Sequence, residues 1–197
     1  TKRLADGTVV HAETGRPVSI GRREVMSKSK KNVVAPGAII DTYGADTARL
    51  FMLSDSPPER DLEWTEAGVE GAWRFLNRLW RMVDEPAFPF ARRDEAKPDR
   101  LSPSAETAWR AVHKAVAAVT EHLDQFRFNV AVAQIRTLTN QLGELDGKGS
   151  GEAWVLRRGL EVAARLIEPM TPHIAEEVWR ALGYETLLGD EPWPVAD

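Results

Sequence analysis

The stretch TEAGVEGAWRFLNRLWRMV, residues 65–83, decides the fold class of this chain. Its large apolar residues recur at helical spacing and fall on one face: Val69, Trp73, Leu76, Trp80 and Val83. This period predicts an amphipathic helix, and we expect its tryptophans to lie in a core. The same periodicity returns in the segments after residue 102. We therefore predict a mainly α protein with an antiparallel bundle of about five helices over residues 65–185.

Start and stop signals separate these helices. Ser102-Pro103 is a good N-cap and first-turn pair, Thr171-Pro172 begins the last helix, and Gly183 ends it. Residues 85–99, EPAFPFARRDEAKPD, contain three prolines and read as a loop. Residues 143–152, GELDGKGSGE, read as a flexible loop.

Residues 1–64 are expected to form a smaller α/β segment. TVVHA (8–12) and PVSI (17–20) are typical of short strands in a hairpin or ribbon. Pro36-Gly37 is expected to break the chain, and a helix over about residues 47–53 is expected after it. Asp46 is its expected N-cap, and Arg49 is the expected local or interdomain partner of Asp46. Consecutive prolines at 57 and 58 end that helix.

Charge is unevenly distributed along the 197 residues, whose formal net charge is −4. Residues 1–31 hold eight basic residues (2, 3, 16, 22, 23, 28, 30 and 31) against three acidic ones, a local balance of +5 that leaves −9 for the rest. The N-terminal part is therefore locally suited to phosphate. The absence of cysteine excludes disulfides and thiolate metal sites. No apolar run approaches the ~20 residues of a membrane span, so we expect a cytoplasmic protein without a membrane partner.

The run EVMSKSKKNVVAPG, residues 24–37, is the first candidate site. Small hydroxyls flank one lysine as Ser27-Lys28-Ser29, after Met26. On composition alone this run is more often an exposed charged loop than a phosphate clamp. It is not a Walker loop, because the glycines ahead of Gly-Lys-Ser/Thr are missing. The pattern does offer one ammonium and nearby hydroxyls to a polyphosphate, so both interpretations remain open.

VMSKS, residues 25–29, resembles the KMSKS signature of class I aminoacyl-tRNA synthetases. The following KKNVVAPGAIIDTYGADTARLFMLSDSPPERDLEWTEAGVEGAWRFLNRLWR (30–81) closely resembles the bacterial leucyl-tRNA synthetase family. FRFNVAVAQIRTLTNQL (126–142) and LIEPMTPHIAEEVWRALG (166–183) resemble the helical anticodon-binding-type domain of that family. The resemblance covers roughly residues 17–197.

This resemblance implies an enzyme that activates leucine with ATP and Mg²⁺ and transfers it to tRNA(Leu). Lys28 is then the catalytic, ATP-phosphate-binding lysine, and Met26, Ser27 and Ser29 complete the ATP-binding loop. Val25 departs from the family, which has a lysine there. A positioned ammonium stabilises the charge that grows on the departing pyrophosphate.

The resemblance also implies a domain order. Residues 1–64 are the end of a catalytic domain with the loop and a stem-contact segment. Residues 65–185 form the tRNA-binding bundle, and 186–197 lead to a missing C-terminal domain. Because no HIGH-type motif or editing domain is present, we expect a C-terminal fragment that is inactive alone. We expect the parent enzyme to be a monomer.

Arg74, Arg78 and Arg81 recur at i, i+4 and i+7, opposite the tryptophan stripe. They form either a solvated basic face, with Glu70 pairing Arg74, or a row of contacts to tRNA phosphates. The histidines match no metal-binding spacing, so no metal site is predicted, and His173 is expected to be structural. Two alternatives to the leucyl hypothesis remain: a non-catalytic helical RNA-binding or adaptor module, and an isoleucyl or valyl synthetase fragment.

Overall fold

The computed structural model describes residues 2–22 and 24–196. Arg23, counted above among the basic residues, lies outside the described residues, as do Thr1 and Asp197 at the ends of the predicted domains. The chain divides into two compact units, residues 1–35 and 36–197, each described by itself below.

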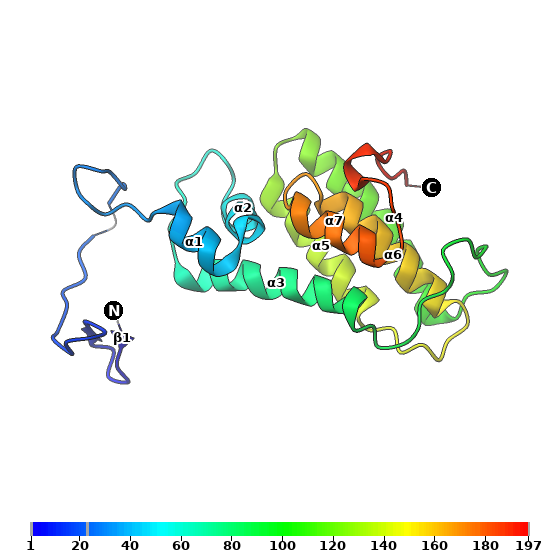
Figure 1. Cartoon of the computed structure of the whole chain (residues 1–197), viewed down its shortest axis with the longest axis horizontal. Helices are drawn as coiled ribbons and strands as arrows, with labels where there is room; N and C mark the ends of the chain where they lie inside the picture. Colours follow the sequence, from blue (N-terminus) through cyan, green and yellow to red (C-terminus); the bar gives the residue numbers. More distant parts are fainter. Residues whose placement is uncertain (1, 23, 197) are drawn as a thin grey trace. The chain divides into compact units, whose positions relative to one another are not determined.

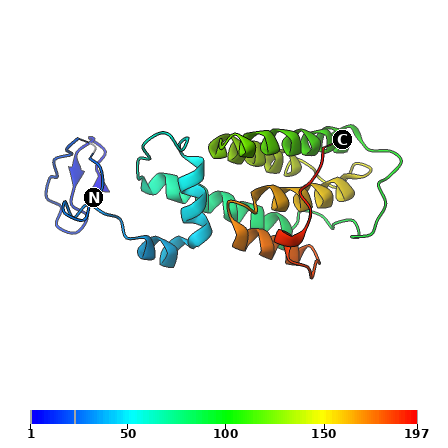
Figure 2. The same cartoon turned by 90° about the horizontal axis from the view of Figure 1, so that it is seen from above.

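The first unit contains a short antiparallel pair of strands, β1 (Lys2–Arg3) and β2 (Val9–Val10) (Figure 2). The intervening turn is closed by the Leu4 N–H, which donates to the Thr8 carbonyl over 2.8 Å. The expected strand in TVVHA is therefore present over two residues. The expected strand in PVSI is wrong beyond a single bridge from Pro17 to Val10, where proline lacks the N–H that a longer ladder needs. The strand at Lys2–Arg3 was not predicted.

The second unit is helical, which confirms the mainly α prediction (Figure 1). Its helices are α1 (Pro36–Tyr43), α2 (Ala45–Ser54), α3 (Glu66–Asp84), α4 (Pro103–Asp124), α5 (Phe128–Leu142), α6 (Glu152–Ile167) and α7 (Pro172–Ala181), followed by the 3-10 turn η1 (Leu188–Asp190). Thr65 caps α3 by accepting from the Gly68 N–H, and Ser102 caps α4 by accepting from the Ala105 N–H. None of the helices in the described part of the chain is both long and apolar enough to cross a membrane.

The core lies between α3 and the four helices that follow it, with α2 packed against α3. The buried face of α3 is formed by Val69, Ala72, Phe75, Leu76, Leu79 and Val83. The expected core position of Trp73 is wrong, because this residue is 42% exposed, and Trp80 is only partly buried. The face centres on Phe75 and Leu79, which leaves both tryptophans at its margin.

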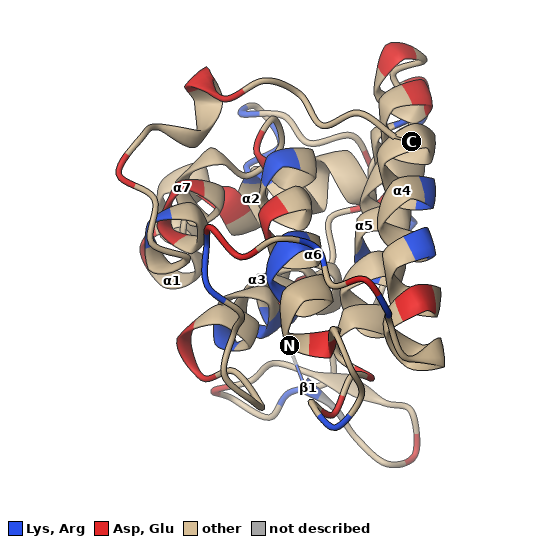
Figure 3. Cartoon of the chain, turned by 90° about the vertical axis from the view of Figure 1, so that its right-hand side faces the viewer, with Lys and Arg blue, Asp and Glu red and all other residues tan. Residues whose placement is uncertain are grey.

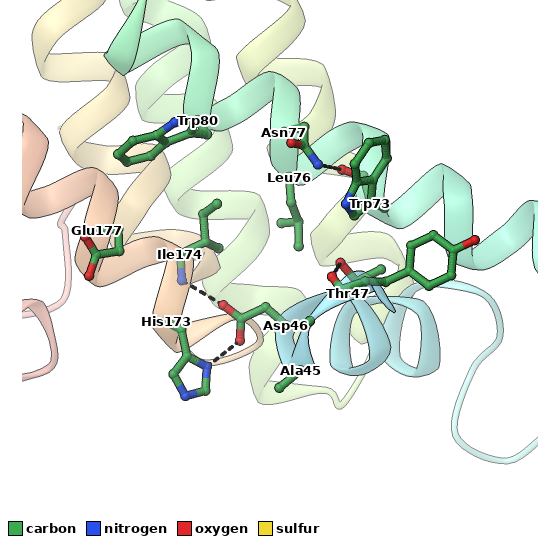
Figure 4. A pocket seen from close by; sticks show the side chains of 12 residues that line it. Ala45, Asp46, Thr47, Trp73, Leu76, Asn77, Trp80, His173, Ile174 and Glu177 are labelled. Atoms are coloured by element: carbon green, nitrogen blue, oxygen red, sulfur yellow. Dashed lines mark hydrogen bonds and ion pairs between the residues drawn. The ribbon is translucent and has the colours of Figure 1, made fainter. Parts of the chain in front are cut away.

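Asp46 and Arg49 both act over long range, so the expected cap by Asp46 and the expected pairing of the two residues are wrong. Helix α2 begins two residues earlier than predicted, with Gly44 at its N-cap and Asp46 in its first turn. The Asp46 carboxylate instead accepts the Ile174 N–H of α7 over 2.7 Å and lies 2.8 Å from His173 Nδ1 (Figure 4). Arg49 donates to the carbonyls of Pro169 and Met170 rather than to Asp46. Together they tie α2 to the turn between α6 and α7, because each satisfies backbone groups that a helix end leaves free.

The loop at 143–152 is held by hydrogen bonds that its composition does not predict. Glu152, 3% exposed, accepts the N–H groups of Asp146 and Gly147, at 3.2 and 2.7 Å, and the hydroxyl of Ser104. The buried carboxylate is thereby hydrogen-bonded from the loop and from α4.

Candidate functional site

In the first unit, the lysine run forms a closed turn around Asn32. The Asn32 side chain accepts from the Ser27 N–H over 2.8 Å and donates to the Val25 carbonyl over 3.3 Å. Between these anchors the chain turns at residues 28–31, where the Lys31 N–H donates to the Lys28 carbonyl. Lys31 takes a left-handed conformation, with φ of 53°. One amide side chain therefore fixes the base of a loop whose tip carries the lysines.

The lysines of this loop are not equivalent. Lys30 Nζ lies 3.1 Å from a carboxylate oxygen of Glu24, so much of its charge is compensated within the loop. Lys28 is exposed, and its ammonium has no hydrogen bond or ion pair to any residue that the structure describes. Lys28 is therefore the better placed of the two to meet an external anion.

The predicted companions of Lys28 lie in the same turn. The hydroxyls of Ser27 and Ser29 are 3.2 Å apart, and Ser27 Oγ also accepts the Lys30 N–H over 3.3 Å. These contacts shape the loop, while Met26 is 41% exposed beside it. The turn thus brings Met26, Ser27, Lys28 and Ser29 together, with one uncompensated cation among them.

In the second unit, the predicted arginine row lines a groove of about 530 Å³ beside the C-terminal end of α5. Arg74 pairs with Glu70 at 3.3 Å, as the solvated-face interpretation expects. Arg78 donates to the side-chain oxygen of Asn140 on α5. Arg81 is exposed, with no ion pair to the described residues. The structure brings all three arginines to one groove, and two of them lack a carboxylate partner there.

A second groove, of about 610 Å³, was not predicted. It lies among the α1–α2 junction, α3 and α7 and is lined by Tyr43, Trp73, Trp80, Asn77 and His173, among others (Figure 4). The rings of Tyr43 and Trp73 meet edge to face with centroids 6.4 Å apart. Trp73 lines this groove, in keeping with its position outside the core.

Two family comparisons match parts of the chain, one around the lysine loop and one from residue 105 onward. Residues 18–65, which include the lysine loop, match the family described as tRNA synthetases class I (I, L, M and V). Residues 105–197 match the anticodon-binding domain of tRNA ligase. These matches make the chain similar to segments of the class I tRNA synthetases.

Within that class, the similarity is to leucine–tRNA ligases. The ligase of Paramagnetospirillum magneticum is 63% identical over 98% of this chain, and that of Rhodospirillum rubrum is 55% identical over 99%. This chain is homologous to a segment of leucine–tRNA ligase, which confirms the predicted resemblance and favours it over the isoleucyl and valyl alternative. It spans 22% and 23% of the length of these two relatives.

Solved structures agree with this assignment. The Agrobacterium radiobacter LeuRS, described in a ternary LeuRS–tRNA–LeuAMS complex, superposes with a TM-score of 0.75 and 30% identity, over 87% of this chain and 22% of that one. The methionyl-tRNA synthetase of Mycobacterium tuberculosis superposes with a TM-score of 0.59 over 78% of this chain and 34% of that one. At 19% identity, the latter match shows a shared fold.

Proposed function

We propose that this chain is the part of a leucine–tRNA ligase that supplies the ATP-binding loop and the tRNA-binding helices. The observation that carries the proposal is the 63% identity to such a ligase over nearly the whole chain. The parent enzyme joins leucine to tRNA(Leu), acts as a monomer in the cytoplasm, and needs further chain for activity. Within it, residues 1–64 end the catalytic domain, 65–185 form the tRNA-binding bundle, and 186–197 lead onward to a C-terminal domain.

Class I tRNA synthetases use ATP, and Lys28 is the proposed contact to its phosphates. In the activation step, a leucine carboxylate oxygen attacks the α-phosphorus, and the bond to pyrophosphate breaks. Negative charge grows on the leaving pyrophosphate, where the Lys28 ammonium stabilises it more than it stabilises bound ATP. The hydroxyls of Ser27 and Ser29 hold the loop in shape, as their mutual contact supports.

Mg²⁺ accompanies ATP in this proposal. Among the described residues, no group of three or more carboxylate or imidazole side chains lies close enough to hold a metal ion. We assign the ion chiefly to the ATP phosphates, in keeping with the preference of Mg²⁺ for few carboxylates and several other oxygens. When bound, it would add to the charge stabilisation that Lys28 supplies.

Arg74, Arg78 and Arg81 are the proposed contacts to the tRNA backbone. They share one groove, and Arg78 and Arg81 have no carboxylate partner among the described residues. Such contacts position RNA without reading its sequence. The competing function, a non-catalytic RNA-binding adaptor, uses the same arginines but assigns no role to Lys28.

Amino-acid-dependent ATP–pyrophosphate exchange separates these functions. We expect no exchange from the 197-residue chain alone and leucine-dependent exchange from the natural full-length protein that contains it. Exchange that depends on isoleucine or valine would point to a different synthetase. A full-length protein that binds tRNA but shows no exchange with any amino acid would establish the adaptor function instead.

A further inference from the structure

Helix α5 differs in charge from its neighbours. Its sequence, FNVAVAQIRTLTNQL, contains no acidic residue, and Arg136 is its one charged side chain. Helix α4, which packs beside it, carries acidic positions toward both ends and basic ones between them (Figure 3). Although the whole chain has a net charge of −4, Arg136 has no carboxylate on its own helix with which to pair.

The guanidinium of Arg136 is indeed uncompensated. It lies over the ring of Phe75 on α3, with 4.9 Å from Cζ to the ring centroid. Its Nε is buried without a hydrogen-bond partner, and no described carboxylate lies within ion-pair distance of it. Burial lowers the pKa of Arg136, in the direction expected for a cation withdrawn from water. A guanidinium nevertheless stays protonated at neutral pH, so the site retains an unpaired positive charge.

One helical turn farther along, α3 and α5 meet again through Arg78 and Asn140. Arg78 donates to Asn140 Oδ1, which is the acceptor of that amide. Asn140 also carries an NH₂ group, a donor, for which the structure gives no partner among the described residues. The two contacts, Phe75 with Arg136 and Arg78 with Asn140, therefore place two guanidinium groups and one amide donor on neighbouring turns of α3 and α5.

We propose that Arg78, Arg136 and Asn140 form a binding site for a backbone phosphate of RNA where α3 and α5 meet. The inference rests on the proposed function in tRNA binding and extends it from the arginine row of α3 to a second helix. A phosphodiester carries one negative charge and presents acceptor oxygens, which matches two guanidinium groups beside an amide donor. Arginine also suits this role because its planar fork donates to two phosphate oxygens at once.

The test measures the affinity of the full 197-residue chain for a tRNA(Leu) transcript by fluorescence anisotropy at several salt concentrations. Neutralising one phosphate contact is expected to reduce the slope of log affinity against log salt by about 0.7 to 0.9. We expect this reduction, with several-fold weaker binding, for Arg136→Gln. Arg136→Lys keeps the charge and is expected to keep most of the slope. The matched control is Arg110→Gln on α4, an exposed arginine 2.6 Å from Glu106, and it is expected to leave the slope unchanged.

If the wild-type chain binds the transcript and a folded Arg136→Gln variant shows the wild-type slope, the phosphate site is overturned while the proposed function stands. If the wild-type chain binds no RNA, its proposed tRNA-binding role fails, and the site is judged by a titration with inorganic phosphate. The NMR resonances of the Arg136 Nη–H groups, which unlike Nε are not buried, are then expected to shift. An unchanged resonance overturns the site independently.

Discussion

Replacing Lys28 with alanine in the full-length ligase is expected to slow leucine-dependent ATP–pyrophosphate exchange by about 10²- to 10³-fold, the loss typical of one preorganised charge-stabilising donor. Lys28 is expected to carry this effect because its ammonium is exposed and has no partner among the described residues. The loop itself is expected to keep its shape, since Asn32 and the Ser27–Ser29 contact form its base without the Lys28 side chain.

The matched control is Lys30→Ala, two residues away in the same turn. Lys30 is already paired with Glu24, so its loss is expected to change the exchange rate much less. Affinity for tRNA(Leu) is expected to stay close to wild type in the Lys28 variant, because the proposed tRNA contacts lie on the bundle. Equal rates for Lys28→Ala and the wild type would remove Lys28 from the ATP site.

Replacing Arg157 with alanine is expected to lower the free energy of unfolding by about 3–5 kcal/mol, the usual result of breaking a buried ion pair from one side. The side chains of Arg157 and Glu161 are 9% and 8% exposed and lie 3.0 Å apart. Arg157 also donates to the carbonyls of Ala91 and Leu182, so it joins α6 to the 85–102 connection and to the end of α7. Its removal leaves those carbonyls and part of a buried carboxylate without a donor.

Thermal unfolding of the 197-residue chain provides the measurement, and the expected loss corresponds to a melting temperature lowered by roughly 6–20 °C for a chain of this size. Arg110→Ala removes an exposed pair with Glu106 and is expected to cost about 0–1 kcal/mol. The double variant Arg157→Met with Glu161→Met removes both buried charges and leaves only the partly exposed Arg158 without its carboxylate partner, so it is expected to be more stable than Arg157→Ala. A loss for Arg157→Ala no larger than that for Arg110→Ala would show that the buried pair does not hold the bundle together.

The helix ends that depend on local chemistry were predictable from the sequence. Ser102 caps α4 through an amide three residues away, so the relevant partner is visible in the printed order of residues. The role of Asp46 is not predictable locally, because its carboxylate accepts a hydrogen bond from the N–H of Ile174, which lies 128 positions later in the sequence. Helix α1 was missed because Pro36-Gly37 was interpreted as a break, whereas proline is well tolerated in the first turn of a helix.

The sides of α3 were predictable only in outline. The helical period is clear, but it does not reveal that Phe75 and Leu79 face the core while Trp73 borders a groove. Which side chains of α3 face the core depends on where α2 and α7 pack, and no local pattern in residues 65–83 predicts that packing.

For the candidate sites, sequence and structure contribute different parts. The family motif singles out Lys28, while the structure adds that Lys30 is held by Glu24 and that the serine hydroxyls face each other. The spacing of Arg74, Arg78 and Arg81 predicts a shared face, which the groove beside α5 confirms. The sequence does not single out Arg136, because its lack of a counterion becomes visible only when α3 and α5 are packed together.

The claim that this segment supplies the ATP-binding loop and the tRNA-binding helices of a leucine–tRNA ligase is tested most directly by exchange into a relative. The recipient is the Paramagnetospirillum magneticum ligase, which is 63% identical over the 193 aligned residues. The measurement is the rate at which the chimaera charges tRNA(Leu) with leucine. We predict a charging rate within about tenfold of that of the parent ligase, which is a difference below about 1.4 kcal/mol in the activation barrier. We also predict that most of this charging rate is lost when the chimaera carries Lys28→Ala. A folded chimaera that leaves tRNA(Leu) uncharged, or one whose rate does not depend on Lys28, would contradict the account.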